Sequence, residues 1–538
     1  MRSKLVVVSS LAAVLAFVAC STFEEVAPPT TTPPGPDSGA DDGATPEGAA
    51  SLNGITFTFL DSADPAYVMP GADLELAFVI ARQPGSAGPI NVSVTSALPA
   101  GLSVVPLIVP AGENQGRVLI RAASATAQGL VAVDVAAVED VPNGARAGAK
   151  RNVFVRGKPG TLDETFGDKG LIASIWPAPF TGNLEDATTT ADGSLLVTGY
   201  RANPNSVHAL AKLTKAGTKD ATFEGGGIVT VQGSQVGTAV VVHPETFALK
   251  GTIDVMSGGL ASIAIHRYDA TGKPVTAFNN GEVVATISGF SQAAGQQLAP
   301  LADGKVLLLG SYSVPASFAV SRWTAAGAVD ATYGSGGACP IDGAGTGGAN
   351  NNAGGVGRMM VSADGSVRVA FAIPGGNAWL KRCTPGGVID PALSKSLGAG
   401  YLVEVASTPD GGMVVLSSIV GDGTLQWRRF SAVGILDTTI GTAGTVATPF
   451  MAQSAGLVVQ PDGKVLIGIG DQADFVITRY LPTGFVDTTF GTQGKLSVPV
   501  AGTNVADLRK LVRQPDGRIV ALGLQYNTAN GAIVRFWP

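Results

Sequence analysis

The feature that most constrains this 538-residue chain is a short motif that recurs seven times in its C-terminal part. Each copy reads close to Asp-x-Thr-Phe-Gly and lies beside apolar runs rich in Val, Ile and Leu. The copies lie in segments that start at Leu162, Asp220, Val275, Val329, Ile389, Leu436 and Val486. Such repetition indicates one small structural unit that buries its apolar faces against its neighbours. Residues 157–538 are therefore predicted to form one repeat array.

A second motif indicates that the repeated unit is built from strand hairpins. Asp-Gly follows Ala or Pro in most units and has an apolar run beside it, as in ADGK from Ala302 and PDGR from Pro515. This is a strong hairpin signal because Gly supplies the positive φ that the turn needs. One unit departs from the pattern and has HPET from His243. Units of about 54 residues with roughly four strands have the size of β-propeller blades.

A cation ends one apolar strand in every unit. In five units, eight residues lead from this cation to an Asp, so that the two side chains are expected to pair across a turn. In the second unit the same step from Arg267 reaches Val275. The expected pairs are Lys212 with Asp220, Arg322 with Asp330, Arg382 with Asp390, Arg429 with Asp437, and Arg479 with Asp487. Residues that recur once per unit are interpreted as structural, including the aromatic residues Phe166, Phe223, Phe278, Tyr333 and Phe490.

The two ends of the array complement each other. Arg535 has no Asp after it, and the position eight residues before Asp163 is Val155 rather than a cation. We therefore predict that the segment around Asp163 completes the sheet begun by the C-terminal strands and places Asp163 beside Arg535. This would close a ring and cover the sheet edges of an open array. The predicted fold class is all-β with a seven-bladed β-propeller, and a β-solenoid-like repeat array is the alternative.

Three sequence patterns that recur in the array resemble those of a known family. The patterns LDxTFGxxG, PDGK and Arg-Tyr-x-x-x-Gly resemble the Delta-60 repeat of exported bacterial proteins, over about 380 residues of this chain. Units six and seven match best, whereas units two and five match loosely. The resemblance implies a propeller-like array on a secreted or envelope protein, and it provides no catalytic residue to transfer.

Residues 1–19 have the features of a signal peptide. A basic start precedes the apolar stretch of 15 residues from Leu5 to Ala19. That stretch reaches about 22 Å as a helix, short of the roughly 30 Å hydrocarbon core, so a transmembrane helix is the weaker interpretation. Phe17-Val18-Ala19-Cys20 resembles the lipobox of bacterial lipoproteins, which implies a lipid anchor on Cys20. An ordinary secretory signal stays open, because Phe17 stands where the family usually has Leu.

The residues after Cys20 predict a tether and an envelope location. Residues 20–50 are dominated by Pro, Thr, Gly, Ala and acidic residues, a composition typical of a disordered linker. Ser21 follows the cysteine, whereas the resemblance associates an Asp there with retention in the inner membrane. We therefore expect a lipid-anchored protein of the outer membrane or cell surface, with a periplasmic or secreted protein as the alternative.

Residues 51–156 are predicted to form a separate immunoglobulin-like β-sandwich. Seven short apolar or alternating runs in about 100 residues, among them LSVVPLIV, are each predicted to form a strand and are separated by turn signals such as MPGAD and PAGENQG. The Cys and Trp marks of an antibody-type domain are absent from this stretch.

The rest of the sequence contains few signals of chemistry. Cys339 and Cys383 lie 44 residues apart and are expected either to form a disulfide or to be buried as small apolar side chains. Neither a cofactor nor a metal is expected, because His208, His243 and His266 lack metal-ligand spacing and no nucleotide or nucleophile motif is present. The net charge of −6 and the lack of a basic block argue against a nucleic-acid partner. The segment Gly343 to Gly357 is interpreted as a mobile loop or a disordered insertion.

Three hypotheses of function follow. We favour a non-enzymatic envelope lipoprotein whose propeller presents one face to a protein or glycan partner. The first alternative is a propeller enzyme that acts on extracellular polysaccharide or peptide, and the second is a periplasmic assembly scaffold. Unpaired carboxylates clustered at one mouth of the central channel would favour the enzyme.

Overall fold

The computed structural model describes fifteen stretches of the chain. They are residues 51–52, 54–60, 66–176, 181–202, 207–231, 237–259, 262–288, 291–314, 316–341, 357–372, 377–419, 423–452, 454–500, 505–525 and 530–538. The predicted signal peptide, Cys20, the tether and almost all of the Gly-rich segment 343–357 lie outside these stretches. Within them, no helix has the length and apolar character needed to span a membrane.

Residues 51–155 form two sheets around one apolar core. The first sheet has the order β1 (Ser51–Leu52), β10 (Arg146–Val155), β9 (Gly129–Glu139), β5 (Ile90–Val94), β7 (Leu107–Val109), with β3 (Ala66–Val68) beside β10. The second has the order β2 (Ile55–Phe59), β4 (Asp73–Arg82), β8 (Gln115–Ala122), β6 (Leu102–Val105). Alternate side chains such as Phe57, Phe78 and Ile120 are buried in the core that the sheets share. The immunoglobulin-like assignment stays a prediction.

The run LSVVPLIV behaves differently from the single strand that its apolar pattern predicts. It divides at Pro106 into β6 and β7, and these two strands belong to different sheets. Proline has no N–H to donate to a ladder, so the pairing with β8 ends there and the chain crosses to β5.

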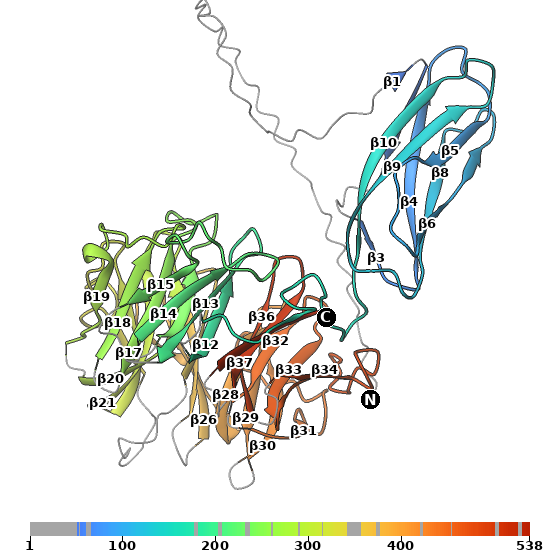
Figure 1. The fold of residues 1–538 in the computed structure, drawn as a ribbon. Helices are drawn as coiled ribbons and strands as arrows, with labels where there is room; N and C mark the ends of the chain where they lie inside the picture. Colours follow the sequence, from blue (N-terminus) through green and yellow to red (C-terminus); the bar gives the residue numbers. More distant parts are fainter. Residues whose placement is uncertain are drawn as a thin grey trace, which may run out of the picture. The chain divides into compact units, whose positions relative to one another are not determined.

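The described residues between 157 and 538 form seven antiparallel four-stranded blades (Figure 1). The first three are β12 (Thr181–Thr189), β13 (Leu195–Ala202), β14 (Val207–Leu213), β15 (Ile228–Val231); β16 (Gly237–Val242), β17 (Ile253–Gly259), β18 (Ser262–Tyr268), β19 (Glu282–Val284), with the short 3-10 turn η1 (Asn279–Gly281) before β19; and β20 (Ser291–Pro300), β21 (Val306–Val314), β22 (Ala316–Trp323), β23 (Ala338–Ile341). The next three are β24 (Gly357–Val361), β25 (Val367–Ala372), β26 (Asn377–Cys383), β27 (Ile389–Ala399); β28 (Tyr401–Ser407), β29 (Met413–Ser418), β30 (Thr424–Phe430), β31 (Val446–Met451); and β32 (Gly456–Val459), β33 (Val465–Asp471), β34 (Asp474–Tyr480), β35 (Lys495–Pro499). The seventh combines β36 (Ala506–Arg513), β37 (Ile519–Gln525) and β38 (Asn530–Phe536) with β11 (Leu171–Ile172).

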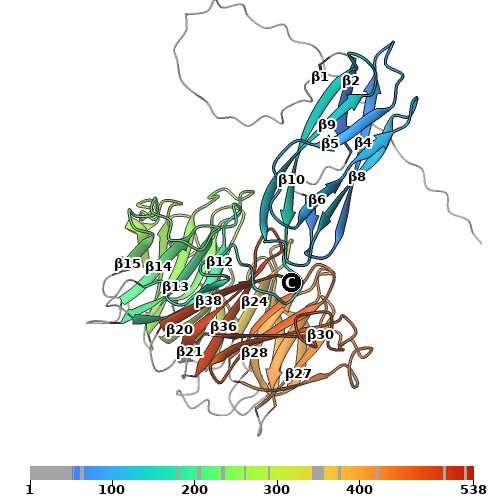
Figure 2. The same ribbon diagram turned by 45° about the vertical axis from the view of Figure 1, so that its right-hand side comes forward.

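The seventh blade is completed by a strand from the start of the array. β11 pairs antiparallel with β38, so that Leu171 lies opposite Val534. A bridge between Gly182 and Asn530 also joins β38 to β12, and Figure 2 shows these strands side by side. The inner strands β12, β16, β20, β24, β28, β32 and β36 contact one another in a closed series. The chain is therefore a closed β-propeller, as predicted from its complementary ends, and not a linear array.

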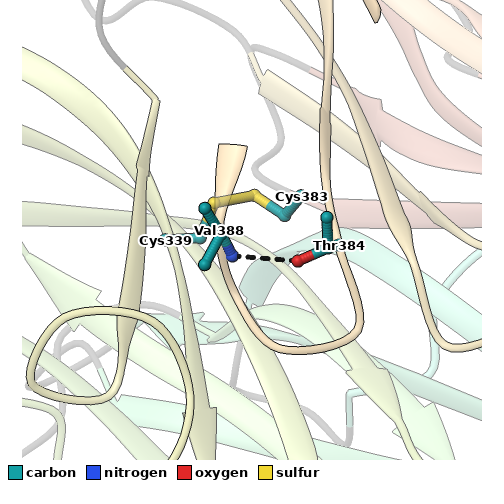
Figure 3. The surroundings of a disulfide bond; sticks show 4 residues. All are labelled: Cys339, Cys383, Thr384 and Val388. Atoms are coloured by element: carbon teal, nitrogen blue, oxygen red, sulfur yellow. Dashed lines mark hydrogen bonds between the residues drawn. A yellow bond between two sulfur atoms is a disulfide. The ribbon is translucent and has the colours of Figure 1, made fainter. Parts of the chain in front are cut away.

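A disulfide joins the third blade to the fourth. Cys339 lies on β23 and Cys383 on β26, and both side chains are buried in the apolar core between these blades. Figure 3 shows the bridge beside the turn in which the N–H of Val388 donates to Thr384 Oγ1 at 3.2 Å. Of the two alternatives left open by the sequence, the structure has the disulfide.

Candidate functional site

The six cation and carboxylate pairs expected from the sequence lie at ion-pair distance in the structure. The partners are Lys212 and Asp220, Arg322 and Asp330, Arg382 and Asp390, Arg429 and Asp437, Arg479 and Asp487, and Arg535 and Asp163, with N–O distances of 2.7–3.0 Å. Four of the pairs connect the end of a third strand to the turn that follows it, and in the fourth blade Arg382 on β26 pairs with Asp390 on the neighbouring strand β27. The sixth connects residues 372 positions apart and lies at the ring closure.

These pairs hold turns together rather than form a site. Asp437 Oδ1 accepts hydrogen bonds from the hydroxyl of Thr439 and from its N–H, while Oδ2 accepts from Arg429. These contacts lower the pKa of Asp437 to about 2, those with Thr439 most strongly. In other blades the cation also covers the recurring aromatic ring, for example Arg535 over Phe166 at 4.3 Å. Carboxylate, cation and aromatic side chain therefore form one structural unit, which we call the outer turn.

The second blade obtains its carboxylate from another strand. Val275 stands where the Asp would be, and Arg267 instead makes two hydrogen bonds of 2.6 and 2.7 Å to Asp254, its cross-strand neighbour on β17. His243 Nε2 lies 2.9 Å from Asp254 Oδ2, and all three side chains are buried. His243 thus has a structural partner.

The other two histidines are also buried. The Nε2 atoms of His208 and His266 lie 2.9 and 2.7 Å from the hydroxyls of Thr198 and Ser257. Burial is the main reason that the pKa of His208 falls to about 3. In the described stretches, no three His, Cys, Asp or Glu side chains are grouped so as to hold a metal ion.

One position on the inner strands distinguishes the blades from one another. It lies six residues before the Asp of the Asp-Gly turn, or before Glu245 in the second blade. The strand pairing shows that this position is equivalent in different blades. Asp186 lies opposite Thr198 and Lys510 lies opposite Leu522, and in both blades the pair is equally far from the Asp-Gly turn. We call this set the channel ring: Asp186, Ala239, Gln297, Arg358, Glu404, Gly456 and Lys510.

Charged members of the channel ring interact between blades. Lys510 Nζ of the seventh blade lies 3.5 Å from Asp186 Oδ1 of the first, and Arg358 Nε of the fourth lies 2.8 Å from Glu404 Oε1 of the fifth. The charge of Asp186, followed by that of Glu404, raises the pKa of Lys510. Burial raises the pKa of Glu404, but Arg358 and Lys510 outweigh this and bring it below its usual value. The four charges therefore form one electrostatic network among blades one, four, five and seven.

β-Bulges place further side chains, most of them polar, beside the ring. In five blades the register shifts immediately before the ring residue. The shift inserts Glu185, Gln296, Val403 and Arg509 in the first, third, fifth and seventh blades, and the second blade has it between Gly237 and Ala239. Bulges re-aim side chains and are common next to functional sites. Gln296 Oε1 accepts a hydrogen bond of 3.3 Å from the N–H of Gly357 in the next blade, which shows that the bulge residues reach across blades.

Four residues where the seventh and first blades meet form what we call the seam site. Arg509 Nη2 lies 2.9 Å from Asp507 Oδ2, and Ser454 donates to the other Asp507 oxygen. Burial raises the pKa of Glu185; the charge of Arg509 opposes this, and that of Asp507 adds to it. Burial and the charge of Glu185 also raise the pKa of Tyr200. Glu185, Tyr200, Asp507 and Arg509 thus influence one another electrostatically.

The sequence prediction missed both groups of inner-strand residues because it searched for residues that recur. The signal that could have found the channel ring was variation between the units. At a constant distance from the hairpin turn, inside an otherwise apolar strand, the seven units carry seven different residues. A position that varies while its neighbours repeat is not fixed by the requirements that all blades share, which makes it a candidate for a role of its own.

Two segments of the propeller match a family model. Residues 190–223 and 460–490 match the family described as "Domain of unknown function (DUF5122) beta-propeller". No curated protein is similar enough to match the chain. The fold is an all-β propeller.

Solved structures with similar folds include proteins of different activities. Prolyl oligopeptidase B from Galerina marginata has 7% sequence identity and a TM-score of 0.37, over 81% of this chain and 56% of that chain, so this chain spans about half of the peptidase. The intramolecular trans-sialidase from Ruminococcus gnavus has 11% identity and a TM-score of 0.24, over 91% of this chain and 94% of that one. A DUF4784 family protein from Bacteroides caccae has 12% identity and a TM-score of 0.27, over 75% and 98%. No activity or residue role is carried over from them.

Proposed function

We propose that this chain is a non-enzymatic, lipid-anchored envelope protein whose propeller binds a protein or glycan partner at its channel. The observation that carries this proposal is the channel ring. Two blades have Ala239 and Gly456 at the ring position, so the framework folds with small residues there. Other blades carry charged residues at this position: Asp186, Arg358 and Lys510 are partly exposed and Glu404 is buried, so that placing these charges here has a desolvation cost. Ligand recognition is a function that would retain them.

The pairing of the ring carboxylates favours binding over catalysis. Asp186 and Glu404 each lie beside a cation of another blade. Paired acid–base catalysis by two carboxylates requires one with a raised and one with an ordinary or lowered pKa, converging on one substrate. In the ring, the pKa of Glu404 is lowered and Asp186 faces an ammonium group. Such an arrangement suits hydrogen bonding to a ligand.

This role can be tested by neutralising one ring pair. Asp186→Ala combined with Lys510→Ala removes both charges and introduces the residue that the second blade already has at this position. We expect a partner from envelope extracts to be retained by the native chain and lost by this double variant. Asp437→Asn, a carboxylate-to-amide change on an outer turn, is the matched control and should retain the partner. Equal retention by all three proteins would contradict a role for the channel.

One observation supports the enzyme as a second candidate. The pKa of Glu185 is raised, mainly by burial, which is a property of general acids. If the chain is a hydrolase that acts on extracellular polysaccharide or peptide, the Glu185→Gln variant should lose turnover while keeping its fold. Incubation of both proteins with polysaccharide and peptide libraries, followed by mass spectrometry of the products, distinguishes the candidates. Products formed by the native chain alone would replace the binding proposal with the enzyme.

The envelope location has its own test, protease treatment of intact cells that express the native chain or Cys20→Ala. For a surface lipoprotein we expect the native chain to remain with the cells and be degraded, and the variant to be released. Protection of the native chain until the envelope is opened would instead support the periplasmic scaffold. Immunoblots of the cell-bound and released fractions provide the measurement.

A further inference from the structure

Resting on the binding role proposed above, we infer that the seam site binds an uncharged, hydroxyl-rich ligand, such as a neutral sugar unit of a glycan. The seam site consists of Glu185, Tyr200, Asp507 and Arg509, where the seventh blade meets the first.

The seam site is held by strands. Glu185 lies on β12, Tyr200 on β13, and both Asp507 and Arg509 on β36. β12 and β13 pair along their length, with Asn183 opposite Tyr200, and β36 contacts β12 as its neighbour in the ring. Side chains on paired strands lose little freedom when a ligand binds, so their hydrogen-bonding directions are set in advance.

The site combines the two kinds of hydrogen-bonding group that a sugar hydroxyl needs. A carboxyl oxygen accepts, a guanidinium donates, and a phenol does both. Arg509 binds Asp507 through Nη2, while its Nε is buried and has no hydrogen-bond partner among the described residues. A buried donor of this kind is normally satisfied in the working state of a protein. About a third of the Arg509 side chain, 32%, is exposed, so part of this side chain can contact a small ligand.

The balance of charge at the seam points to an uncharged ligand. The carboxylate of Asp507 is paired with Arg509, and that of the neighbouring Asp186 lies beside Lys510. The shift of the Glu185 pKa favours the neutral carboxyl form. An acidic sugar would have to compete with carboxylates already beside these cations, and a cationic ligand would meet Arg509 and Lys510.

The side chains of the site fit a sugar better than a protein surface. Protein interfaces depend on large apolar or aromatic anchors that enter desolvated pockets. The channel ring and seam site contain no exposed large aliphatic side chain among the described residues.

The test measures binding of residues 21–538 to a panel of neutral gluco-, manno- and galacto-oligosaccharides and uronate-containing oligosaccharides. Glu185→Ala and Arg509→Ala are compared with the native chain and with the outer-turn control Asp437→Asn, all checked for folding by circular dichroism. We expect at least one neutral oligosaccharide to bind. Arg509→Ala should weaken binding by about 10- to 100-fold, as for the loss of a hydrogen bond to a charged group, and Glu185→Ala by about 10-fold, as for the loss of a neutral hydrogen bond. The control should bind as the native chain does. Glu185→Gln and Arg509→Lys serve as conservative variants where an alanine variant fails to fold.

Four other results would overturn the inference, and they differ in what they imply for the proposed function. Neutral oligosaccharide binding that both seam variants preserve places the ligand elsewhere on the propeller. Selection of uronate-containing oligosaccharides contradicts the charge argument. Failure to bind any oligosaccharide, while the ring variant still loses a protein partner, ends the inference and leaves the proposed function intact. Failure to bind any partner ends both.

Discussion

The outer turns and the channel ring both recur once per blade, yet they differ in what they preserve. On the outer turns, cation and carboxylate are repeated almost without change, and each pair fastens a turn to its strand. In the channel ring no two blades carry the same residue. Repetition therefore marks where every blade needs the same geometry, and variation marks where the blades differ in what they need. In a repeat protein the residues that differ are the first candidates for function.

The second blade shows how strongly the outer turn requires its ion pair. Val275 removes the carboxylate from the turn, and Asp254 supplies one from the neighbouring strand. At the equivalent cross-strand position the other blades have Leu196, Leu307, Arg368, Val414, Leu466 and Val520. In the second blade the carboxylate is in a different place from the other blades, but the cation is still paired. The reason is that burying a guanidinium without a partner costs free energy.

The largest expected effect comes from breaking this relocated pair. Asp254→Leu should lower the free energy of unfolding by about 3–5 kcal/mol, because it leaves Arg267 buried without its carboxylate. Adding Val275→Asp to this variant should restore part of the loss, since it returns a carboxylate to the usual turn position. Urea unfolding followed by circular dichroism measures both. A loss below about 1 kcal/mol would show that Arg267 does not depend on Asp254.

The ring closure provides the next test. Asp163 accepts hydrogen bonds from both Arg535 and Arg518 at 2.7 Å and is fully buried. Asp163→Asn should cost about 2–3 kcal/mol, as expected for weakening a charge-assisted hydrogen bond. Limited proteolysis should then release the C-terminal strands earlier than in Asp437→Asn. Identical cleavage of both variants would mean that strand pairing alone closes the ring.

Mutation of the channel ring should weaken partner binding with little effect on stability, whereas mutation of the outer turns should lower stability. Asp186→Ala with Lys510→Ala should weaken partner binding by tenfold or more, about 1.4 kcal/mol, while the free energy of unfolding changes by less than about 1 kcal/mol. Binding titrations and urea unfolding of the same preparations test both halves. A large loss of stability with unchanged affinity would assign the ring to the framework.

The mutation of an exposed outer turn should have a smaller effect on stability. Asp437→Asn weakens a pair in which the side chains of Arg429 and Asp437 are 31% and 22% exposed. We expect a loss of at most about 1 kcal/mol by urea unfolding, as for partly solvated ion pairs. A loss as large as that of Asp254→Leu would remove the distinction between the relocated and the ordinary pair.

The smallest expected effect is on the pH dependence of stability, where ionisation of Asp437 stabilises the protein and ionisation of Glu185 destabilises it. The pKa of Asp437 is lowered to about 2 from a usual 3.8, so its contribution to stability is present above about pH 4 and disappears as the pH falls toward 2. The pKa of Glu185 is raised from 4.5, so its ionisation costs stability as the pH rises above that value. Unfolding midpoints between pH 2 and 7 should show that Asp437→Asn loses its effect in acid. Glu185→Gln should stabilise the protein only above pH 4.5.

Much of the propeller could be predicted from local patterns. The Asp-Gly turns mark hairpins because only certain residues permit their backbone conformation, and the eight-residue step from Arg479 to Asp487 brings two side chains to one turn. The ring closure could also be predicted, because Arg535 and Asp163 each lack the partner that the other provides. The break at Pro106 was missed because an apolar pattern alone does not show where a strand leaves its sheet.

The sequence by itself determined the repeated unit, the number of blades, the outer-turn pairs and the way in which the ends join, because these depend on backbone turns and alternating side chains over a few residues. Only the tertiary structure decided that Arg267 pairs with Asp254, that Cys339 is bonded to Cys383, and which residues of the channel ring and seam site lie beside one another. Lys510 and Asp186 become neighbours only when the seventh blade closes against the first. A charge network assembled across the centre of a ring depends on that closure, which no local pattern encodes.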